Sequence, residues 1–310
     1  MDKSIRNGYV IKLFDPWRSP LCTCPIKYSL HPYTGCSHQC VYCYATSYIR
    51  VRKSIPKRDL IQKLKRDLRK VNPALPIVLS TSSDPYPPEE LQYKLTRKVL
   101  ELLVPRGFKI LIVTKGTIIT RDLDLLSKGN AAVTMTITTI HDYLSKKLEP
   151  NAPPSSSRLE ALRRLVNSKV PVGVRVDPII PYINDDVEDI YMLLKELKNI
   201  GVKFIVTSTY KARPDSLKRL TNAFPEIARK VNELYRKHGI RVHGYIYLPL
   251  DLRIKILKNV ISIAKQFKMK YAICREGLGQ EFTNSPTCDG THLIPIRIKL
   301  QNQGVDIGRR

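Results

Sequence analysis

The chain has 310 residues, 43% of them hydrophobic, which is enough for the core of one large α/β barrel or of two smaller domains. Lys and Arg number 53 against 27 Asp and Glu, a net charge of +26 that exceeds the needs of solubility and favours a polyanionic partner. No apolar run is long enough for a membrane span and the N-terminus shows no secretory signal, so we expect a cytoplasmic protein without membrane attachment. A Lys-rich thermophile surface is the alternative explanation of the charge, although that habit usually raises Glu as well.

Short β-rich runs alternate with amphipathic segments along most of the chain. Strands are predicted at 27–32, 76–81, 109–114, 132–138, 171–177, 203–208, 241–247 and 270–274. Helices are predicted at 57–71, 90–104, 119–128, 155–168, 184–199, 214–238 and 253–267. Runs such as KILIVT and FIVTS are apolar throughout, as in parallel strands that are covered on both faces.

Regular βα repetition predicts a full or partial (β/α) TIM-like barrel, with a doubly wound open sheet as the alternative. We expect three parts: an N-terminal extension (1–26), the barrel (27–274) and a C-terminal extension (275–310). In such barrels the functional side chains follow the C-terminal ends of the strands.

The segment HPYTGCSHQCVYCYA (31–45) carries Cys36, Cys40 and Cys43 in the spacing C-x3-C-x2-C. A 4Fe–4S cluster normally takes four thiolates, so three leave one iron open to a cofactor or substrate. The alternative is a zinc site with His38 as a fourth ligand, although zinc sites usually show paired C-x2-C units. The motif therefore predicts a 4Fe–4S cluster.

With Tyr42 at its aromatic position, this motif resembles the signature of the radical S-adenosylmethionine (radical SAM) superfamily, C-x3-C-x-aromatic-C. The resemblance implies that the open iron chelates the amino and carboxylate groups of S-adenosylmethionine. It also implies reductive cleavage of this cofactor to methionine and a 5′-deoxyadenosyl radical that abstracts hydrogen from a substrate. An electron donor such as ferredoxin or flavodoxin would be the protein partner.

Further segments, among them STSSDPYPPEE (80–90), ITTIHDYLSKKLEPNAPP (137–154) and VPVGVRVDPIIPYIND (170–185), are similar to the spore photoproduct lyase-like branch, whose members are often labelled DNA repair photolyases. The similarity spans about residues 30 to 210 and implies a partial (β/α) barrel. Spore photoproduct lyase has a catalytic cysteine in a C-T-S-D stretch, where this chain has Thr81-Ser82-Ser83-Asp84. Because this thiol is absent, Cys274 is a candidate for the missing hydrogen donor.

The candidates for cofactor contacts are Tyr42, Ser82, Ser83, Asp84, Lys115 and Arg175. The resemblance places the 82–84 turn near the methionine amine and Lys115 near the cofactor. A turn-stabilising role for Asp84 and a solvated charge for Lys115 are the alternatives. Arg175 lies in an apolar strand and requires either the cofactor carboxylate or Asp177 as its partner. His31 and His38 are predicted to be hydrogen-bonding loop residues.

Four cysteines lie outside the motif: Cys22, Cys24, Cys274 and Cys288. They are enough for one zinc ion or one auxiliary iron–sulfur cluster, which makes them a candidate second metal site. Cys22 and Cys24 precede the first predicted strand whereas Cys274 ends the last, so they meet only if a segment folds back. Ordinary buried free thiols are the alternative.

Between Arg50 and Lys70 there are ten basic residues and two acidic ones. This basic segment is predicted to contact phosphates beside the active site, with Tyr44, Tyr48 and Tyr86 stacking an extruded base. The leading hypothesis is therefore a radical SAM enzyme acting on nucleic acid, in DNA repair or RNA modification. The alternatives are a nucleic-acid-binding protein with a structural cluster, and a radical SAM enzyme that acts on a protein or a metabolite.

Overall fold

The computed structural model describes residues 7–14, 19 and 21–299, and its centre is one eight-stranded sheet of order β1-β2-β5-β6-β7-β8-β9-β12. The strands of this sheet are β1 (Ile11–Leu13), β2 (Tyr28–Leu30), β5 (Ile77–Leu79), β6 (Ile110–Thr114), β7 (Ala131–Thr136), β8 (Val172–Ile179), β9 (Phe204–Thr209) and β12 (Lys270–Ile273). Two small antiparallel ladders lie outside it, β3 (Tyr33–Thr34) with β4 (Ile55–Pro56) and β10 (Ile240–Val242) with β11 (Tyr245–Tyr247).

From β2 to β12 all neighbouring strands are parallel, and only β1 pairs antiparallel, with β2. The apolar runs explain this arrangement, because ILIVT of β6 is buried almost throughout, as a strand covered on both faces must be. The two end strands, β1 and β12, do not pair with each other. The predicted (β/α) architecture is therefore confirmed in its partial, open form.

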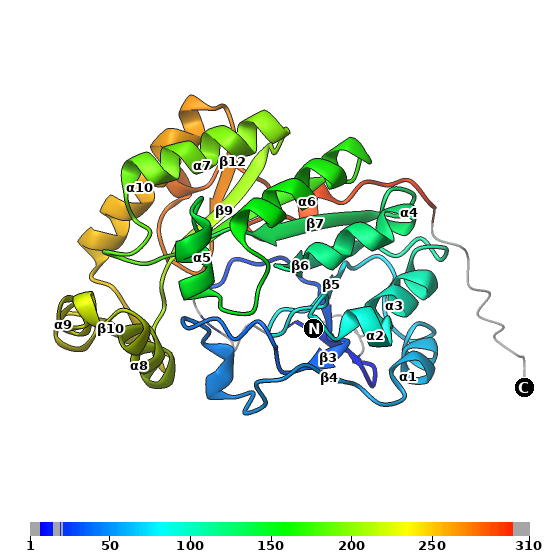
Figure 1. The fold of residues 1–310 in the computed structure, drawn as a ribbon. Coiled ribbons are helices and arrows are strands. Elements are labelled where there is room, and N and C mark those ends of the chain that lie inside the picture. The colour runs from blue at the N-terminus through cyan, green and yellow to red at the C-terminus, as the bar shows by residue number, and fades with distance from the viewer. Residues whose placement is uncertain (1–6, 15–18, 20, 300–310) are drawn as a thin grey trace, which may run out of the picture.

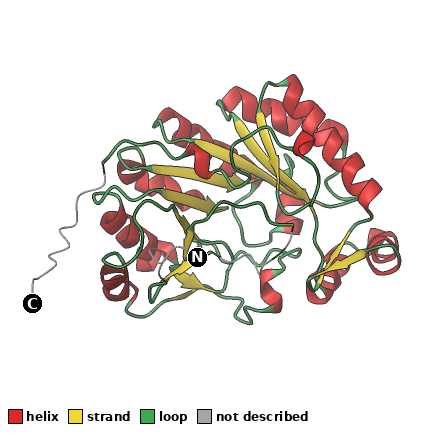
Figure 2. Ribbon diagram, turned by 180° about the vertical axis from the view of Figure 1, so that it is seen from behind, coloured by secondary structure: helices red, strands yellow, loops and turns green. Residues whose placement is uncertain are grey.

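Helices cover the outer side of the curved sheet, whereas α8 and α9 lie beside the β10–β11 hairpin, as Figures 1 and 2 show from opposite directions. The helices of the described residues are α1 (Leu60–Asp67), α2 (Glu90–Tyr93), α3 (Leu95–Leu103), α4 (Leu123–Leu126), α5 (Asp142–Leu148), α6 (Ser155–Asn167), α7 (Val187–Ile200), α8 (Pro214–Ala223), α9 (Ala228–Asn232) and α10 (Leu250–Gln266). Shorter helical turns are η1 (Ala45–Ser47), η2 (Thr117–Asp122), η3 (Pro225–Ile227), η4 (Glu233–Lys237), η5 (Gln280–Phe282) and η6 (Thr291–Leu293). In the described part of the chain, no helix has the length and apolarity for a membrane span.

The predicted elements differ from the structure at a few places. The run 241–247 forms the β10–β11 hairpin instead of a strand of the main sheet, and α5 was not predicted. The predicted helix 90–104 is interrupted at Lys94, which adopts a left-handed conformation with φ 49°. The predicted helix 214–238 ends before Pro225, which lacks the N–H that a continuing helix needs.

The interior of the open barrel is filled from the C-terminal part of the chain. Leu293 and Ile294 pack against Val78, Leu111 and Ala132 on the inner face of the sheet. These apolar side chains thus fill one part of the barrel interior, and the rest of the interior remains available for a cavity.

Asn130, which is almost fully buried, fixes this C-terminal segment to the sheet. Its side-chain amide donates to the carbonyl oxygens of Gly107 (2.8 Å) and Ile298 (2.7 Å). Its side-chain oxygen accepts from the backbone N–H groups of Arg297 (2.6 Å) and Ile298 (2.9 Å). The Asn130 side chain therefore holds the C-terminal segment through hydrogen bonds of the kind that backbone groups form between neighbouring strands.

We predict that Asn130→Ala lowers the free energy of unfolding by about 1–3 kcal/mol, because it leaves buried backbone groups without partners. Hydrogen exchange at Arg297 and Ile298 should accelerate, since both amides lose their acceptor. Asn222→Ala, at an exposed position of α8, is the matched control and should change neither measurement. Unchanged exchange at 297–298 in Asn130→Ala would show that this segment is held by other contacts.

Candidate active site

A cavity of about 470 Å³ lies inside the open barrel, within the size range of small-molecule sites. Its wall is built largely from residues at the C-terminal ends of β5, β6, β7, β8, β9 and β12 and from the cysteine loop 36–48. All the predicted metal and cofactor residues except Cys288 line it: Cys22, Cys24, Cys36, Cys40, Tyr42, Cys43, Ser82, Ser83, Asp84, Lys115, Arg175 and Cys274. The structure therefore brings together residues that lie up to 252 positions apart in the sequence, from Cys22 to Cys274.

The cysteine loop is held by the connection between α5 and α6. The N–H of Val41 donates to the carbonyl of Leu148 (2.9 Å), and the N–H of Asn151 donates to the carbonyl of His38 (3.2 Å). The side-chain amide of Asn151 donates to the carbonyl of Ser37 (3.0 Å). These bonds hold the backbone on both sides of Cys40.

The three thiols of the motif fit a 4Fe–4S cluster by their chemistry and placement. Cys36, Cys40 and Cys43 are free, and all three line the same cavity. Burial raises the pKa of the Cys40 thiol to about 12, and ligation of a metal requires this thiol to lose its proton. Within the described residues, no three His, Cys, Asp or Glu side chains already surround a position for a single metal ion.

A buried charge network behind the motif was missed by the sequence analysis. Glu149 has no exposed surface, accepts a hydrogen bond from the Tyr42 hydroxyl, and forms an ion pair with the equally buried Arg158. The Lys115 amine lies 4.0 Å from the Glu149 carboxylate. Burial alone would raise the pKa of Glu149, but Arg158 and Lys115 hold it below its usual range. Nothing in the sequence around Glu149 distinguishes it from a surface glutamate.

Lys115 carries a positive charge at the cavity wall. Burial alone would lower its pKa, but Cys40 and Glu149 raise the pKa above its ordinary value. Its amine also lies 5.7 Å from the centre of the Tyr42 ring. Lys115 is therefore a fixed cation beside the motif rather than a solvated loop charge.

The Asp84 carboxylate connects the loops that follow β5 and β6 through hydrogen bonds. Its carboxylate accepts hydrogen bonds from the N–H of Tyr86 (2.9 Å), the hydroxyl of Thr114 (2.6 Å) and the N–H of Lys115 (2.7 Å), and lies 3.3 Å from His38. Burial alone would raise the pKa of Asp84, but His38 and these hydrogen bonds lower it to about 2. Both carboxylate oxygens already have partners, which favours a positioning role.

Two further candidates for cofactor contacts, Ser83 and Arg175, have defined partners. Ser83 contacts the ring nitrogen Nδ1 of His31 at 3.2 Å and donates to the carbonyl of Tyr33. Arg175 donates to Asp177 at 2.7 Å, so the ion pair considered from the sequence is formed, and both side chains line the cavity.

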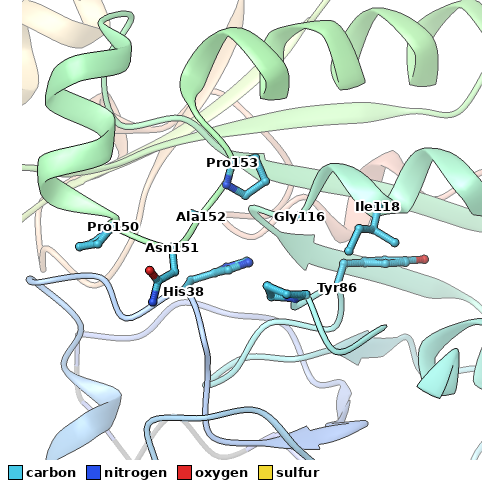
Figure 3. A pocket seen from close by; sticks show the side chains of 9 residues that line it. His38, Tyr86, Gly116, Ile118, Pro150, Asn151, Ala152 and Pro153 are labelled. Atoms are coloured by element: carbon cyan, nitrogen blue, oxygen red, sulfur yellow. The ribbon is translucent and has the colours of Figure 1, made fainter. Parts of the chain in front are cut away.

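His38 also lines a second, smaller cavity of about 280 Å³. Figure 3 shows His38 and Asn151 on one side of it and Tyr86 and Ile118 on the other. Tyr86 is fully buried and its hydroxyl donates to Asp122 (3.1 Å), so the prediction that it stacks a base is wrong. Tyr44 and Tyr48 do line the larger cavity.

Aromatic rings and guanidinium groups stack behind one wall of the larger cavity, which Tyr44 and Arg275 line. The Arg275 guanidinium lies 5.1 Å from the ring centre of Tyr44 and 4.9 Å from that of Tyr245, and the two rings meet edge to face. Arg213 lies over Tyr245 at 4.4 Å. We call Tyr44, Tyr245, Arg213 and Arg275 the cation–aromatic stack. The sequence analysis found only Tyr44, because the other members lie far away in the sequence.

A second buried cation borders the same cavity. Lys211 is only 5% exposed, and its amine donates to Glu276 (2.9 Å) and to the carbonyl of Thr209 (3.1 Å). The cavity wall thus carries the cationic groups of Lys115, Arg175, Lys211 and Arg275 together with the carboxylates of Asp84, Asp177 and Asp289.

The basic segment 50–70 does not border the cavity. Its helix α1 packs against α3 on the outer side of the sheet, and none of its residues is among those that line the cavity. Contact of this segment with phosphates would therefore extend along the outer surface.

The comparisons with known proteins agree with this geometry. Residues 30–194 match the family model described as "Radical SAM superfamily". This match covers more than half of the chain, so the protein belongs to the radical SAM superfamily. Membership implies a 4Fe–4S cluster and S-adenosylmethionine as cofactors.

Similar proteins and solved structures are known, but they do not identify a substrate for this chain. The uncharacterized protein ORF301 of Acidianus two-tailed virus is 35% identical over 188 residues, which are 54% of this chain and 62% of the viral protein. A radical SAM Nα-GlyT isomerase of Pseudomonas phage M6 is 24% identical over 285 residues, 84% of this chain and 58% of the isomerase. A solved structure of spore photoproduct lyase with dinucleoside spore photoproduct has the same fold, with a TM-score of 0.64 at 16% identity over 87% of this chain and 80% of the lyase.

We predict that Glu149→Gln lowers the free energy of unfolding by about 3–5 kcal/mol, because it leaves the Arg158 charge buried without a counter-ion. The iron content after anaerobic reconstitution should fall as well, since Tyr42 and the cysteine loop lose their anchor. Denaturant unfolding and iron analysis measure the two effects. Glu226→Gln, which removes only an exposed partner of Lys147, is the control and should match the parent. Parent-like stability of Glu149→Gln would contradict the anchoring role.

Proposed function

We propose that this protein is a radical SAM enzyme that abstracts hydrogen from a nucleic-acid substrate, in DNA repair or RNA modification. The observation that carries the proposal is the cation–aromatic stack, two members of which, Tyr44 and Arg275, line the same cavity as the three thiols of the motif. Stacked aromatic rings and guanidinium groups bind nucleobases and phosphates.

Charge and kinship support the same substrate class. The net charge of +26 would attract a polyanion along the whole surface, not only at the cavity. The solved lyase with the same fold holds a dinucleoside lesion. An extruded nucleotide would bring its base to the stack and its phosphates to the cations around it.

The chain's own residues would hold the cofactors in defined places. Cys36, Cys40 and Cys43 would ligate the cluster, which together with S-adenosylmethionine supplies the hydrogen-abstracting chemistry of the family. Lys115 and Arg175 would present cations to the cofactor carboxylate, and Ser82 would offer an acceptor to its amine. Asp84 would position the Lys115 loop through its hydrogen bonds, and Tyr42 would link the motif to Glu149.

We predict that Cys36→Ala, Cys40→Ala and Cys43→Ala each abolish reductive cleavage of S-adenosylmethionine, because a cluster that lacks one of three ligands is lost or inert. The measurement is 5′-deoxyadenosine formed anaerobically with a strong reductant. Ser47→Ala, at an exposed position of the same loop, is the control and should cleave the cofactor like the parent. Cleavage at the parental rate in any of the three cysteine variants would refute the assignment of the cluster.

The nucleic-acid proposal predicts a steep salt dependence of affinity, with a log–log slope of about −0.9 per phosphate neutralised on duplex DNA. Replacing Arg58, Lys65 and Arg69 together by Gln should flatten this slope and weaken binding to all sequences alike, because backbone contacts carry no sequence information. All three side chains are exposed on or next to α1. Binding titrations from low to high salt measure the slope.

A charge-matched control separates a phosphate track from net charge. Replacing the exposed Lys255, Lys258 and Lys265 of α10 by Gln removes the same charge from a helix on another part of the surface. This control should keep most of the parental slope. If the two triple variants lost equal parts of the parental slope, the basic segment would be an ordinary solvated face of the protein. No salt-dependent binding by the parent would overturn the nucleic-acid proposal.

A further inference from the structure

The gap between the two ends of the open sheet is bridged by cysteines outside the motif. Cys22 and Cys24 lie between β1 and β2 at one end, Cys274 directly follows β12 at the other end, and Cys288 lies farther along the C-terminal segment. We propose that these four thiols form a second, tetrathiolate metal centre that closes the gap and is occupied by a zinc ion or an iron–sulfur cluster.

The four cysteines converge although they come from three separate segments. The sulfur atoms of Cys24 and Cys288 are 3.6 Å apart, and Cys24 and Cys274 pack against the buried group formed by Cys288, Ala272 and Phe204. Cys22 is separated from Cys24 by one residue and lines the same cavity as Cys24 and Cys274. The loop before β2 thus folds back into the barrel, which resolves the difficulty that the strand positions raised.

The distance between Cys24 and Cys288 fits shared ligation better than a disulfide. A disulfide bond requires about 2.0 Å between its sulfurs. In a tetrahedral zinc–thiolate site with Zn–S bonds of about 2.3 Å, two sulfurs are about 3.8 Å apart. The pair already has this spacing, while no three ligand side chains surround an ion position among the described residues. Metal binding would therefore draw Cys22 and Cys274 toward the pair and release the thiol protons.

The electrostatic surroundings suit an anionic centre. Four thiolates around one divalent ion carry a net charge of −2, which is costly to bury without a nearby cation. Lys27 is 2% exposed, lies beside Cys24, and forms an ion pair with Asp289, the residue after Cys288. This buried pair crosses the same gap as the cysteines, so the gap is already bridged by one polar contact at the proposed centre.

This assignment removes Cys274 from the role of hydrogen donor, because a thiolate bound to a metal carries no S–H hydrogen to give. It also gives the seven cysteines of the chain two separate tasks. The three of the motif serve the catalytic cluster, and the other four hold the ends of the sheet together. The inference does not depend on which substrate the enzyme uses.

The test begins with a variant that lacks the catalytic cluster, Cys36→Ala/Cys40→Ala/Cys43→Ala, isolated anaerobically with zinc, iron and sulfide supplied in separate preparations. Metal analysis should find a tightly bound metal in this protein. One zinc per chain with four sulfur neighbours in X-ray absorption identifies the zinc form. Iron with acid-labile sulfide and a Mössbauer signal of a cluster identifies the iron–sulfur form.

Adding Cys24→Ser and Cys288→Ser to that variant should remove the bound metal, whereas adding Ser285→Ala, three residues from Cys288, should leave it bound. A metal-free cluster-deficient protein in all preparations would overturn the proposal. So would full metal content after Cys24→Ser/Cys288→Ser or after Cys274→Ser in the same background.

A second measurement covers the case in which the serine variants fail to fold. In the parent protein, bound metal should shield Cys22, Cys24, Cys274 and Cys288 from alkylation, and a chelator should expose all four together, as peptide mass spectrometry can show. Alkylation of these thiols at equal rates with and without chelator would contradict the centre. Formation of 5′-deoxyadenosine is followed in parallel, so that a failure of the catalytic cluster is recognised separately.

Discussion

An open parallel sheet cannot enclose its own interior, and this constraint governs the rest of the structure. The end strands β1 and β12 are not paired with each other, so the inner face must be covered by segments outside the repeating βα units. The C-terminal segment supplies Leu293 and Ile294 for the apolar part, and the loop before β2 supplies Cys22 and Cys24 for the side. What remains between them and the cysteine loop is the cavity. Both terminal segments are therefore parts of the site rather than appendages to it.

The polar interior is organised by two buried carboxylates. Glu149 connects the motif to α6 through Tyr42 and Arg158, while Asp84 connects the loops after β5 and β6. Each carboxylate is compensated by hydrogen bonds and by a cation or a histidine, as burial of charge requires. The thiols and Lys115 thus lie between two hydrogen-bonded groups, one around Glu149 and one around Asp84. A site that must hold a reactive cofactor in one orientation benefits from such preorganisation.

The sequence predicted those features that depend on local patterns. Apolar runs identified all the parallel strands of the sheet, because a strand covered on both faces has no polar side. The spacing of Cys36, Cys40 and Cys43 was sufficient for the family. The sequence did not reveal Glu149, Glu276 or the cation–aromatic stack, whose roles arise only when distant segments meet. Tyr86 shows the converse error, since a tyrosine after a strand can point into the core as readily as into the cavity.

The contact between Cys24 and Cys288 joins two segments that are made at different times. A chain is synthesised from its N-terminus, and Cys288 follows Cys24 by 264 residues. Until Cys288 is made, its contact with Cys24 cannot form. Closure of this side of the cavity is therefore a non-local step of folding, which costs the entropy of closing a very long loop.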